Sequence, residues 1–341
     1  MLRYIFALRW YHWLWISSLA LVLSVGLLFV INGTLLAWQE RPMLGVSAHA
    51  PLPEISLIPV TKDQPSTAGA NSPAADSATA STTSAQDSSS PSATPTCKIV
   101  AFNLAKCWVT RDYRSFVPAA EVRGRLQRIA KIINDEQPDL VFLSEVVKEA
   151  GWTGVDQVTE LADMCQMHAW AFGENYNIGL PFYRAVGGNA ILSRRPLEAV
   201  ENPSLAGRKP FYQTVNSRRI LYCRQKIGGQ NVLLGSIHND SWVRDNNLVQ
   251  MRQILEYVGD QPAILAGDFN AWPEWPQIQE VINSGKFAPP RLGMPTHSST
   301  APTRQIDYIF APTGWQLLEQ HVVPDDVSDH LAVVATYAVS E

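Results

Sequence analysis

A carboxylate and an amide, two positions apart, follow a short apolar run in the second half of the chain. The segment is Ala263–Asn270, in which Gly267 ends the apolar run and Asp268 and Asn270 follow it. A run of this length, closed by a turn signal, predicts a buried strand. Burying an ionised carboxylate is costly unless it contacts a metal, a proton or a cation. The segment therefore indicates a chemical site, although Gly, Asp and Asn are also ordinary turn residues.

Other apolar segments also carry a polar residue at or near one end. They are Ile99–Asn103, Leu140–Glu145, Val232–His238, Ile306–Phe310 with Asp307, and Leu331–Ala335, which follows Asp329 and His330. Hydrolysis of a phosphate ester needs a cation for the phosphate oxygens, an activated water and donors for the developing charge. Carboxylates and an amide suit Mg²⁺, and imidazoles with carboxylates serve proton transfer.

In this order, the segments resemble the endonuclease/exonuclease/phosphatase superfamily of metal-dependent phosphoesterases. The resemblance runs from about Cys97 to the end of the chain. It implies an α/β fold, a four-layer αββα sandwich of two mostly antiparallel sheets. It also implies Mg²⁺, with Mn²⁺ as the alternative, and hydrolysis of a phosphodiester or phosphomonoester. The expected strands outnumber the helices, and several follow one another directly, which suits two packed sheets better than one doubly wound sheet.

The resemblance implies a metal site at the ends of the first two strands. Glu145 corresponds to the main metal ligand of the family, and Asn103 assists it. Asp329 adds a further ligand or a contact to one. The family usually has Gln before this Glu, whereas this chain has Ser144. Because the Glu itself is present, the difference leaves the metal assignment in place.

The catalytic roles implied by the resemblance fall on the later motifs. Asp268 orients or deprotonates the attacking water, and Asn270 holds the phosphate. Asp307 pairs with His330, whose ring acts as general base or as a donor to the phosphate. The sequence leaves open whether Asp268 or His330 is the base.

His238 separates branches of the family. Branches that resemble pancreatic-type nucleases, sphingomyelinases and inositol-phosphate phosphatases have a His at this strand end, which protonates the leaving oxygen. The abasic-site endonuclease branch has Tyr there. His238 therefore disfavours that branch, and the same resemblance places Asn189 near the site.

The N-terminal segment predicts a membrane anchor. From Trp10 to Gln39 no residue is acidic or basic apart from a histidine, and the apolar run Leu14–Ile31 is long enough to span a bilayer. Arg3 and Arg9 precede it, so the positive-inside bias puts the N-terminus in the cytoplasm and the rest outside. We therefore predict a cytoplasmic stub and transmembrane anchor over 1–40. A cleaved signal peptide is the alternative, since residues 48–50 resemble a cleavage site.

Residues 41–96 are rich in Ser, Thr, Ala and Pro and predict a disordered linker, followed by one catalytic domain over 97–341. The net charge is −4, so the chain lacks the basic balance of a protein that grips many phosphates of DNA. We interpret the pairs Arg208–Lys209 and Arg218–Arg219 as solvated surface. Lipid or small phosphodiester substrates are favoured, and a monomer is expected. An extracytoplasmic endonuclease and a catalytically silent binding domain are the alternatives.

The remaining expectations concern elements, loops and thiols. Strands are expected near 98–104, 140–144, 189–193, 220–227, 232–237, 263–266, 306–310, 316–322 and 331–337, and helices near 120–134, 155–167, 246–258 and 275–283. We assign substrate choice to loops at 108–118, 173–188 and 288–304. The four cysteines, Cys97, Cys107, Cys165 and Cys223, leave disulfides and free thiols equally open.

Overall fold

A computed structural model describes residues 2–32, 42–47, 95–108, 117–208 and 218–340. Helix α1 (Leu2–Ile31) contains an apolar segment, Trp10–Ile31, of 22 residues with a mean hydropathy of 2.5. None of the most apolar window is buried, so α1 is not a core helix. By length and composition it is one candidate membrane span, and a signal sequence would have the same properties.

Two sheets make up the folded part of the chain. The first has the order β1-β4-β5-β3-β2-β12-β11 and the second β10-β9-β8-β7-β6. The strands of the first sheet are β1 (Met43–Val46), β2 (Thr96–Asn103), β3 (Leu140–Ala150), β4 (Ala169–Leu180), β5 (Tyr183–Ser193), β11 (Gln316–Val323) and β12 (Ala332–Ala338). Those of the second are β6 (Glu198–Glu201), β7 (Leu221–Ile227), β8 (Gln230–His238), β9 (Ala263–Asp268) and β10 (Asp307–Phe310). Only the pairs β2–β3 and β8–β9 are parallel, which confirms two mostly antiparallel sheets.

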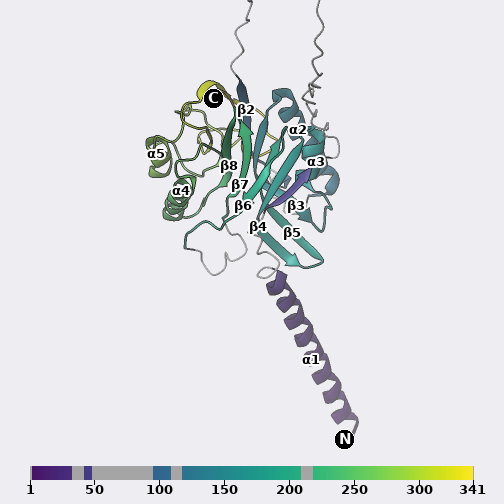
Figure 1. Cartoon of the computed structure of the whole chain (residues 1–341). Coiled ribbons are helices and arrows are strands. Elements are labelled where there is room, and N and C mark those ends of the chain that lie inside the picture. The colour runs from purple at the N-terminus through teal and green to yellow at the C-terminus, as the bar shows by residue number, and fades with distance from the viewer. Residues whose placement is uncertain (1, 33–41, 48–94, 109–116, 209–217, 341) are drawn as a thin grey trace, which may run out of the picture. The chain divides into compact units, whose positions relative to one another are not determined.

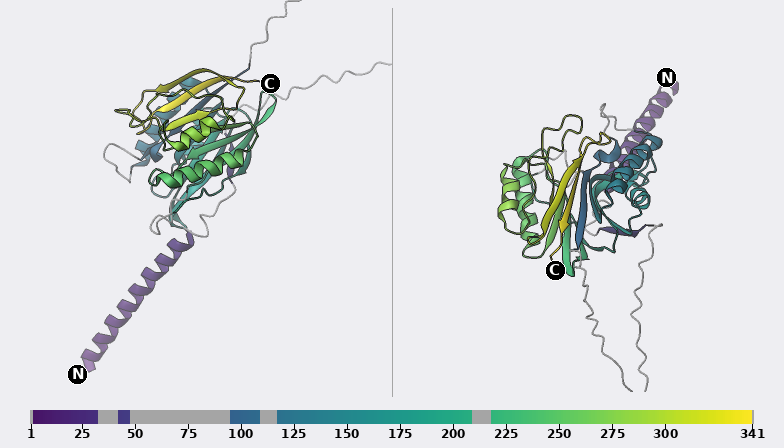
Figure 2. Two further views of the ribbon diagram at one scale, coloured as in Figure 1. Left: turned by 90° about the vertical axis from the view of Figure 1, so that its left-hand side faces the viewer. Right: turned by 90° about the horizontal axis from the view of Figure 1, so that it is seen from above.

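The two sheets pack face to face, with helices on both outer sides (Figure 2). Helices α2 (Ala119–Glu136) and α3 (Gln157–Met164) cover the first sheet, and α4 (Arg244–Val258) and α5 (Pro276–Asn283) cover the second (Figure 1). Three buried clusters fill the spaces between these layers. The predicted four-layer αββα sandwich is therefore confirmed.

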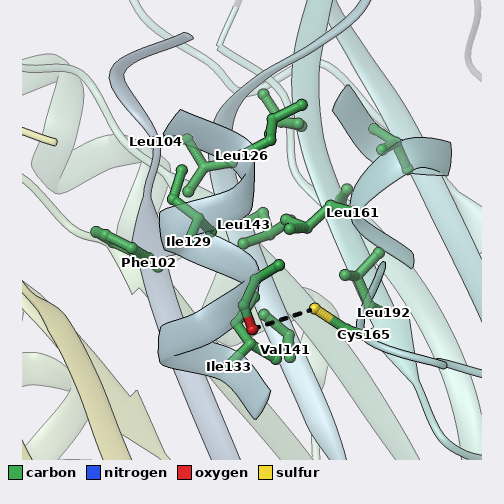
Figure 3. Packing of buried hydrophobic residues seen from close by; sticks show 14 of the residues in the cluster. Phe102, Leu104, Leu126, Ile129, Ile133, Val141, Leu143, Leu161, Cys165 and Leu192 are labelled. Atoms are coloured by element: carbon green, nitrogen blue, oxygen red, sulfur yellow. Dashed lines mark hydrogen bonds between the residues drawn. The ribbon is translucent and has the colours of Figure 1, made fainter. Parts of the chain in front are cut away.

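Helix α2 shows how the sequence pattern produces this packing. Val122, Leu126, Ile129 and Ile133 recur at helical spacing and are buried against β2 and β3 (Figure 3). Each such side chain contributes about 1.5–3 kcal/mol on full burial. Arg123, Arg128 and Lys131 lie on the solvent side, whereas Arg125 is largely buried and donates to the carbonyl oxygen of Cys107 at 3.4 Å. Strand β9 has both faces covered, which explains why its sequence is a continuous apolar run rather than an alternation.

The structure differs from the sequence predictions in three segments. Residues 43–46, which we assigned to the linker, form β1 and pair with β4. Strands β4 and β6 were not predicted, and residues 173–188, expected as a loop, belong to the β4–β5 hairpin. The cause is composition: β4 buries Asn175 and Asn177, so neither an apolar run nor an alternation marks it. Linker residues 48–94 and loop residues 109–116 lie outside the described residues.

The cysteines are free thiols. All four are buried and none forms a disulfide with another. Burial is the main reason why the pKa of each thiol rises to about 12. Figure 3 shows Cys165 beneath α2, where its thiol donates to the carbonyl oxygen of Ala130 at 3.9 Å. The open question from the sequence is answered in favour of buried thiols.

Candidate active site

The register of the second sheet places three candidate residues side by side. Strands β8 and β9 are parallel, and His238 is the register partner of Asp268. On the other side of β9, antiparallel β10 pairs Asp307 with the same Asp268. Three apolar runs that lie far apart in the sequence therefore end at one edge of the sheet, and Asp268 is at the centre.

The first sheet supplies two more residues from its central parallel pair. Asn103 ends β2 and is the register partner of Ser144 in β3, so Glu145 follows directly. The amide nitrogen Nδ2 of Asn103 donates to Oδ2 of Asp268 at 3.0 Å, which joins the two sheets across the site. The amide oxygen of Asn103 accepts from the backbone N–H of Ala105 at 2.9 Å. This backbone donor fixes which end of the amide faces Asp268.

Asp268 is held on both oxygens. Oδ1 accepts from the backbone N–H of Asn270 at 2.9 Å, and Oδ2 accepts from Asn103. Burial, together with the nearby carboxylate of Asp307, raises the pKa of Asp268 to about 7. Asn270 adopts φ +49° and donates its side-chain N–H to the carbonyl oxygen of Asn239 at 3.2 Å.

Asp307 and His330 form the predicted carboxylate–imidazole pair. Nδ1 of His330 lies 2.8 Å from Oδ2 of Asp307, which also accepts from the hydroxyl of Thr296 at 2.6 Å. Nε2 of His330 lies 3.8 Å from Oδ2 of Asp268. Burial opposes protonation of the ring, but the charges of Asp307 and Asp268 prevail and raise the pKa of His330 to about 10. The ring is therefore a donor on both nitrogens.

His238 has a partner that the sequence interpretation missed. Nη1 of Arg218 lies 3.0 Å from Nδ1 and 2.9 Å from Nε2 of His238, and Arg218 also donates to the hydroxyl of Ser241 at 3.2 Å. Nε2 of His238 is 3.6 Å from Glu145 and 3.7 Å from Asp268. Burial first, and then the charge of Arg218, lower the pKa of His238 well below its usual range.

The interpretation of Arg218–Arg219 as solvated surface is wrong, because both side chains are buried. Nη1 of Arg219 donates to the carbonyl oxygen of Asn202 at 2.7 Å. Within the described residues, no carboxylate lies within ion-pair distance of Arg218, although Glu145 and Asp268 are near enough to act on its charge. The sequence offered one signal of this burial: the two arginines stand immediately before the apolar residues at the start of β7.

A left-handed turn beside Asn103 brings a cation to Glu145. Ala105, Lys106 and Cys107 have φ values of +46°, +62° and +53° in succession, and Glu145 has φ +52°. None of these residues is glycine, so the backbone is strained at this point, as is common at functional sites. The ammonium of Lys106 bonds to Oε2 of Glu145. Burial alone would raise the pKa of Glu145, but Lys106 and Arg218 hold it well below its usual range.

Asp329 and Asn189 take different places around this centre. Asp329 is half-buried, and its ligand atoms lie within 4.8 Å of those of His297 and His330. His297, which the sequence interpretation missed, contacts the His330 ring edge-on with centroids 4.8 Å apart. Asn189 is fully buried and donates to the carbonyl oxygens of Arg219 and Ser236, both at 3.2 Å. Its amide therefore ties the two sheets together.

The side chains of the site suit a hard divalent cation. The carboxylates of Asp268 and Asp307 lie close together, with oxygens within 4.8 Å of each other and of a His330 ring nitrogen. Oδ1 of Asp307 is buried, and no described residue donates to it. Glu145 contributes an ionised carboxylate on the opposite sheet. Carboxylate oxygens of this kind are the ligands that Mg²⁺ and Mn²⁺ prefer.

Comparison with known proteins agrees with this geometry. The model of the Endonuclease/Exonuclease/phosphatase family matches residues 100–330. The chain belongs to this family. Members generally use divalent metals, which the acidic and histidine groups of the site would accommodate. The segment that matches the family model contains all eight catalytic and metal-binding residues predicted from the sequence.

The chain is also similar to one curated protein and to solved structures. It is 25% identical to the uncharacterized protein YbhP of Escherichia coli K12 over 190 residues, which cover 51% of this chain and 67% of YbhP. It also resembles the crystal structure of an endonuclease/exonuclease/phosphatase from Beutenbergia cavernae, with a TM-score of 0.59 and 23% identity over 72% of each chain. A Bacteroides vulgatus structure of the same family gives a TM-score of 0.54 at 17% identity, covering 72% of this chain and 100% of that one. These structures support the fold.

Proposed function

We propose that the chain is a membrane-anchored, Mg²⁺-dependent phosphoesterase that hydrolyses a phosphodiester or phosphomonoester by in-line attack of water. The observation that carries the proposal is the convergence of Glu145, Asp268, Asp307, His238 and His330 at facing edges of two sheets. A domain that only binds a partner has no need for two buried carboxylates, a third that is partly exposed, and two imidazoles gathered at one place. Such an arrangement is costly to fold unless the groups bind a cation or transfer protons.

Asp268 is the residue that we assign as general base. Its oxygens are oriented by Asn270 and Asn103, and each oxygen keeps capacity for one further hydrogen bond. A base fixed in this way can accept a proton from a water placed against the phosphorus. The N–H of Asn103 thus positions Asp268, in addition to the assistance to the metal that the resemblance implies.

His330 and Arg218 are the groups that we assign to the phosphate. His330 donates from Nδ1 to Asp307, which leaves the N–H of Nε2 directed to the side of Asp268. Arg218 brings a guanidinium into the same buried space without a carboxylate within ion-pair distance among the described residues. Both can donate to phosphate oxygens as negative charge develops. Asn270 retains the phosphate-holding role implied by the resemblance.

The expected role of His238 changes in this proposal. The resemblance implied that His238 protonates the leaving oxygen, which requires an imidazolium. Arg218 lies against both ring nitrogens, so the neutral ring is favoured. We therefore assign His238 to positioning Arg218 and to hydrogen bonding with the phosphate. Protonation of the leaving oxygen then falls to solvent or to His330.

Glu145 is the principal residue that we assign to the metal, with Asp307 and Asp329 as further carboxylates. When bound, the cation would neutralise phosphate oxygens and lower the pKa of water in contact with it. Lys106 bonds to Oε2 of Glu145, so its ammonium would compete with the metal for that oxygen. A metal that takes this oxygen would release the side chain to the phosphate.

The apolar helix supports the membrane part of the proposal. Residues 10–31 are long and apolar enough to span a bilayer, and the arginines before them favour a cytoplasmic N-terminus. The catalytic domain would then lie on the extracytoplasmic side. The net charge of −4 favours a lipid or small phosphodiester over DNA.

The test is hydrolysis by the purified full chain in sugar-detergent micelles. The substrates are bis-p-nitrophenyl phosphate, p-nitrophenyl phosphate and supercoiled plasmid DNA, each with Mg²⁺ and with EDTA. We expect turnover of at least one small ester that EDTA and Asp268→Asn both abolish. Faster turnover of plasmid DNA would favour the endonuclease alternative. Absence of turnover for all three, with Mg²⁺ and with Mn²⁺, would contradict the proposal.

A further inference from the structure

An apolar pocket of about 400 Å³ lies beside the candidate active site. Its volume is within the usual range for small-molecule sites. The side chains that line it in the described part of the chain include Lys106, Trp108, Trp152, Tyr176, Ile178 and Tyr183. They come from the left-handed turn after β2, the end of β3 and the β4–β5 hairpin. Apart from Lys106, none of them is among the residues that we assign to the active site.

Lys106 connects the pocket to the catalytic centre. Its side chain lines the pocket, and its ammonium bonds to Glu145. A group in the pocket is therefore separated from the carboxylate of Glu145, which we assign to the metal, only by the side chain of Lys106. A substrate whose phosphate lies at Glu145 would extend its remaining part past Lys106 into this space.

The walls of the pocket suit an aliphatic chain better than a nucleobase. The rings of Trp108 and Trp152 have centroids 5.0 Å apart and planes tilted by 49°. The ring planes of Trp152 and Tyr183 are tilted by 51°. Tilted rings in mutual contact leave no parallel pair of faces between which a planar base would stack. Of the side chains that line the pocket in the described part of the chain, only Lys106 is charged, and it already bonds to Glu145.

The mouth of the pocket exposes apolar side chains on the same hairpin. Ile178 and Tyr183 line the pocket and are 41% and 50% exposed, and Phe182 at the tip is 76% exposed. Adjacent exposed apolar residues of this size mark a contact surface rather than ordinary loop composition. A hairpin that offers them beside an apolar pocket suits an amphiphile drawn from a lipid surface, and the chain also carries the apolar segment Trp10–Ile31.

We infer that the pocket between the 105–108 turn and the β4–β5 hairpin binds the aliphatic chain of a phosphoester lipid while its phosphate lies at the metal site. The inference rests on the proposed function and specifies its substrate class. It predicts that chain length, rather than the identity of a base, governs kcat/KM. The first methylenes contribute most, because the pocket is of limited volume.

The test compares alkyl p-nitrophenyl phosphodiesters with methyl, butyl and octyl chains, using the full chain in sugar-detergent micelles. We expect kcat/KM to rise from methyl to octyl by at least tenfold, since each buried methylene can contribute up to about a fourfold gain. Ile178→Ser should lower the octyl-to-methyl ratio of kcat/KM by about fivefold. The matched control is Leu318→Ser, an exposed aliphatic residue on β11 that is 52% exposed and outside the pocket. Partitioning of the esters into micelles is the same for wild type and variant, so it cancels when their octyl-to-methyl ratios are compared.

A second measurement is independent of turnover. The dissociation constants of octylphosphonate and methylphosphonate are measured by calorimetry for the wild type and for Ile178→Ser. Tighter octylphosphonate binding that the variant loses supports the inference even for a form that turns over slowly. Methyl turnover without any dependence on chain length, in rate or in binding, overturns the inference and leaves the proposed function intact. Thymidine p-nitrophenyl phosphate turned over faster than the octyl ester would also overturn it, in favour of a nucleoside. Loss of all metal-dependent turnover with octylphosphonate binding retained would refute the proposed function alone.

Discussion

The catalytic cluster and the aromatic pocket beside it are built in different ways, although Lys106 belongs to both. The cluster is assembled by sheet register: His238, Asp268 and Asp307 are direct neighbours because β8, β9 and β10 are paired. The pocket depends on the left-handed turn at 105–107 and on the β4–β5 hairpin. Strand register is determined by the apolar pattern of whole strands, so the relative positions of the catalytic side chains are tightly constrained. Loops and turns carry binding residues in many folds, so the turn and the hairpin suit the selection of a substrate.

Two glutamates, one in the catalytic cluster and one in the β4–β5 hairpin, differ in their electrostatic environment. Glu145 in the cluster has Lys106 and Arg218 nearby, which hold its pKa well below the usual range despite burial. Glu174 in β4 is buried with Oε1 lacking a partner in the described part of the chain, and burial raises its pKa to about 7. Nearby cations therefore keep Glu145 ionised, whereas burial prevails at Glu174 on the hairpin side and favours the neutral acid.

The largest expected effect comes from removing the carboxylate at the centre of the cluster. Asp268→Asn keeps the size of the side chain but abolishes its basicity, so kcat should fall by about 10³-fold or more. The measurement is Mg²⁺-dependent hydrolysis of bis-p-nitrophenyl phosphate. Asp260→Asn, at a fully exposed position, is the matched control and should have wild-type activity. A fall of less than tenfold in Asp268→Asn would remove Asp268 from the role of base.

Arg218 should rank second, because it acts on the charge of the phosphate rather than on the proton of water. Replacing it in Arg218→Met should reduce kcat by about 10²-fold, as for other donors to a developing negative charge. The exposed Arg128→Met on α2 serves as the control. If Arg218→Met changes only the thermal stability and not kcat, the guanidinium is structural and the phosphate assignment fails.

Much of the cluster could be predicted from the sequence, and the pocket could not. Apolar runs predicted the strands that carry Asn103, Glu145, His238 and Asp268, because burial on both faces of a strand leaves a continuous apolar segment. The strand end predicted at Glu145 is wrong, since β3 continues to Ala150. Arg218 was missed because a pair of arginines usually lies on the surface.

The pocket lacked any comparable signal. The turn at 105–107 contains no glycine to indicate left-handed backbone, and β4 has buried asparagines in place of an apolar pattern. Such features depend on tertiary contacts, among them the bond between Lys106 and Glu145. Local sequence patterns therefore do not record them.

Glu174→Gln tests the hairpin side of the comparison through stability. Below pH of about 4.5 the carboxyl is protonated in both states, and between 4.5 and about 7 only the unfolded chain ionises. The wild type should therefore lose stability as pH rises through this window, by at most about 3 kcal/mol. The variant should lack that loss and become the more stable form at pH 7.5, measured by urea unfolding at several pH values. The exposed Glu256→Gln is the control, and a Glu174→Gln difference that does not vary with pH would show that Glu174 is ionised in the fold.

The smallest effect is expected at Lys106, where the two regions meet. Its ammonium competes with a divalent cation for Glu145, and a partly exposed ion pair of this kind contributes up to about 1 kcal/mol. Lys106→Met should therefore tighten Mg²⁺ binding by about threefold to fivefold, measured by calorimetry without substrate. Lys148→Met removes a similar ion pair, to Asp156, from the same strand as Glu145 and should leave Mg²⁺ affinity unchanged. Weaker Mg²⁺ binding in Lys106→Met would show that Lys106 holds Glu145 in position for the metal instead of competing with it. The cluster and the pocket would then be coupled through strain in the 105–107 turn rather than through charge.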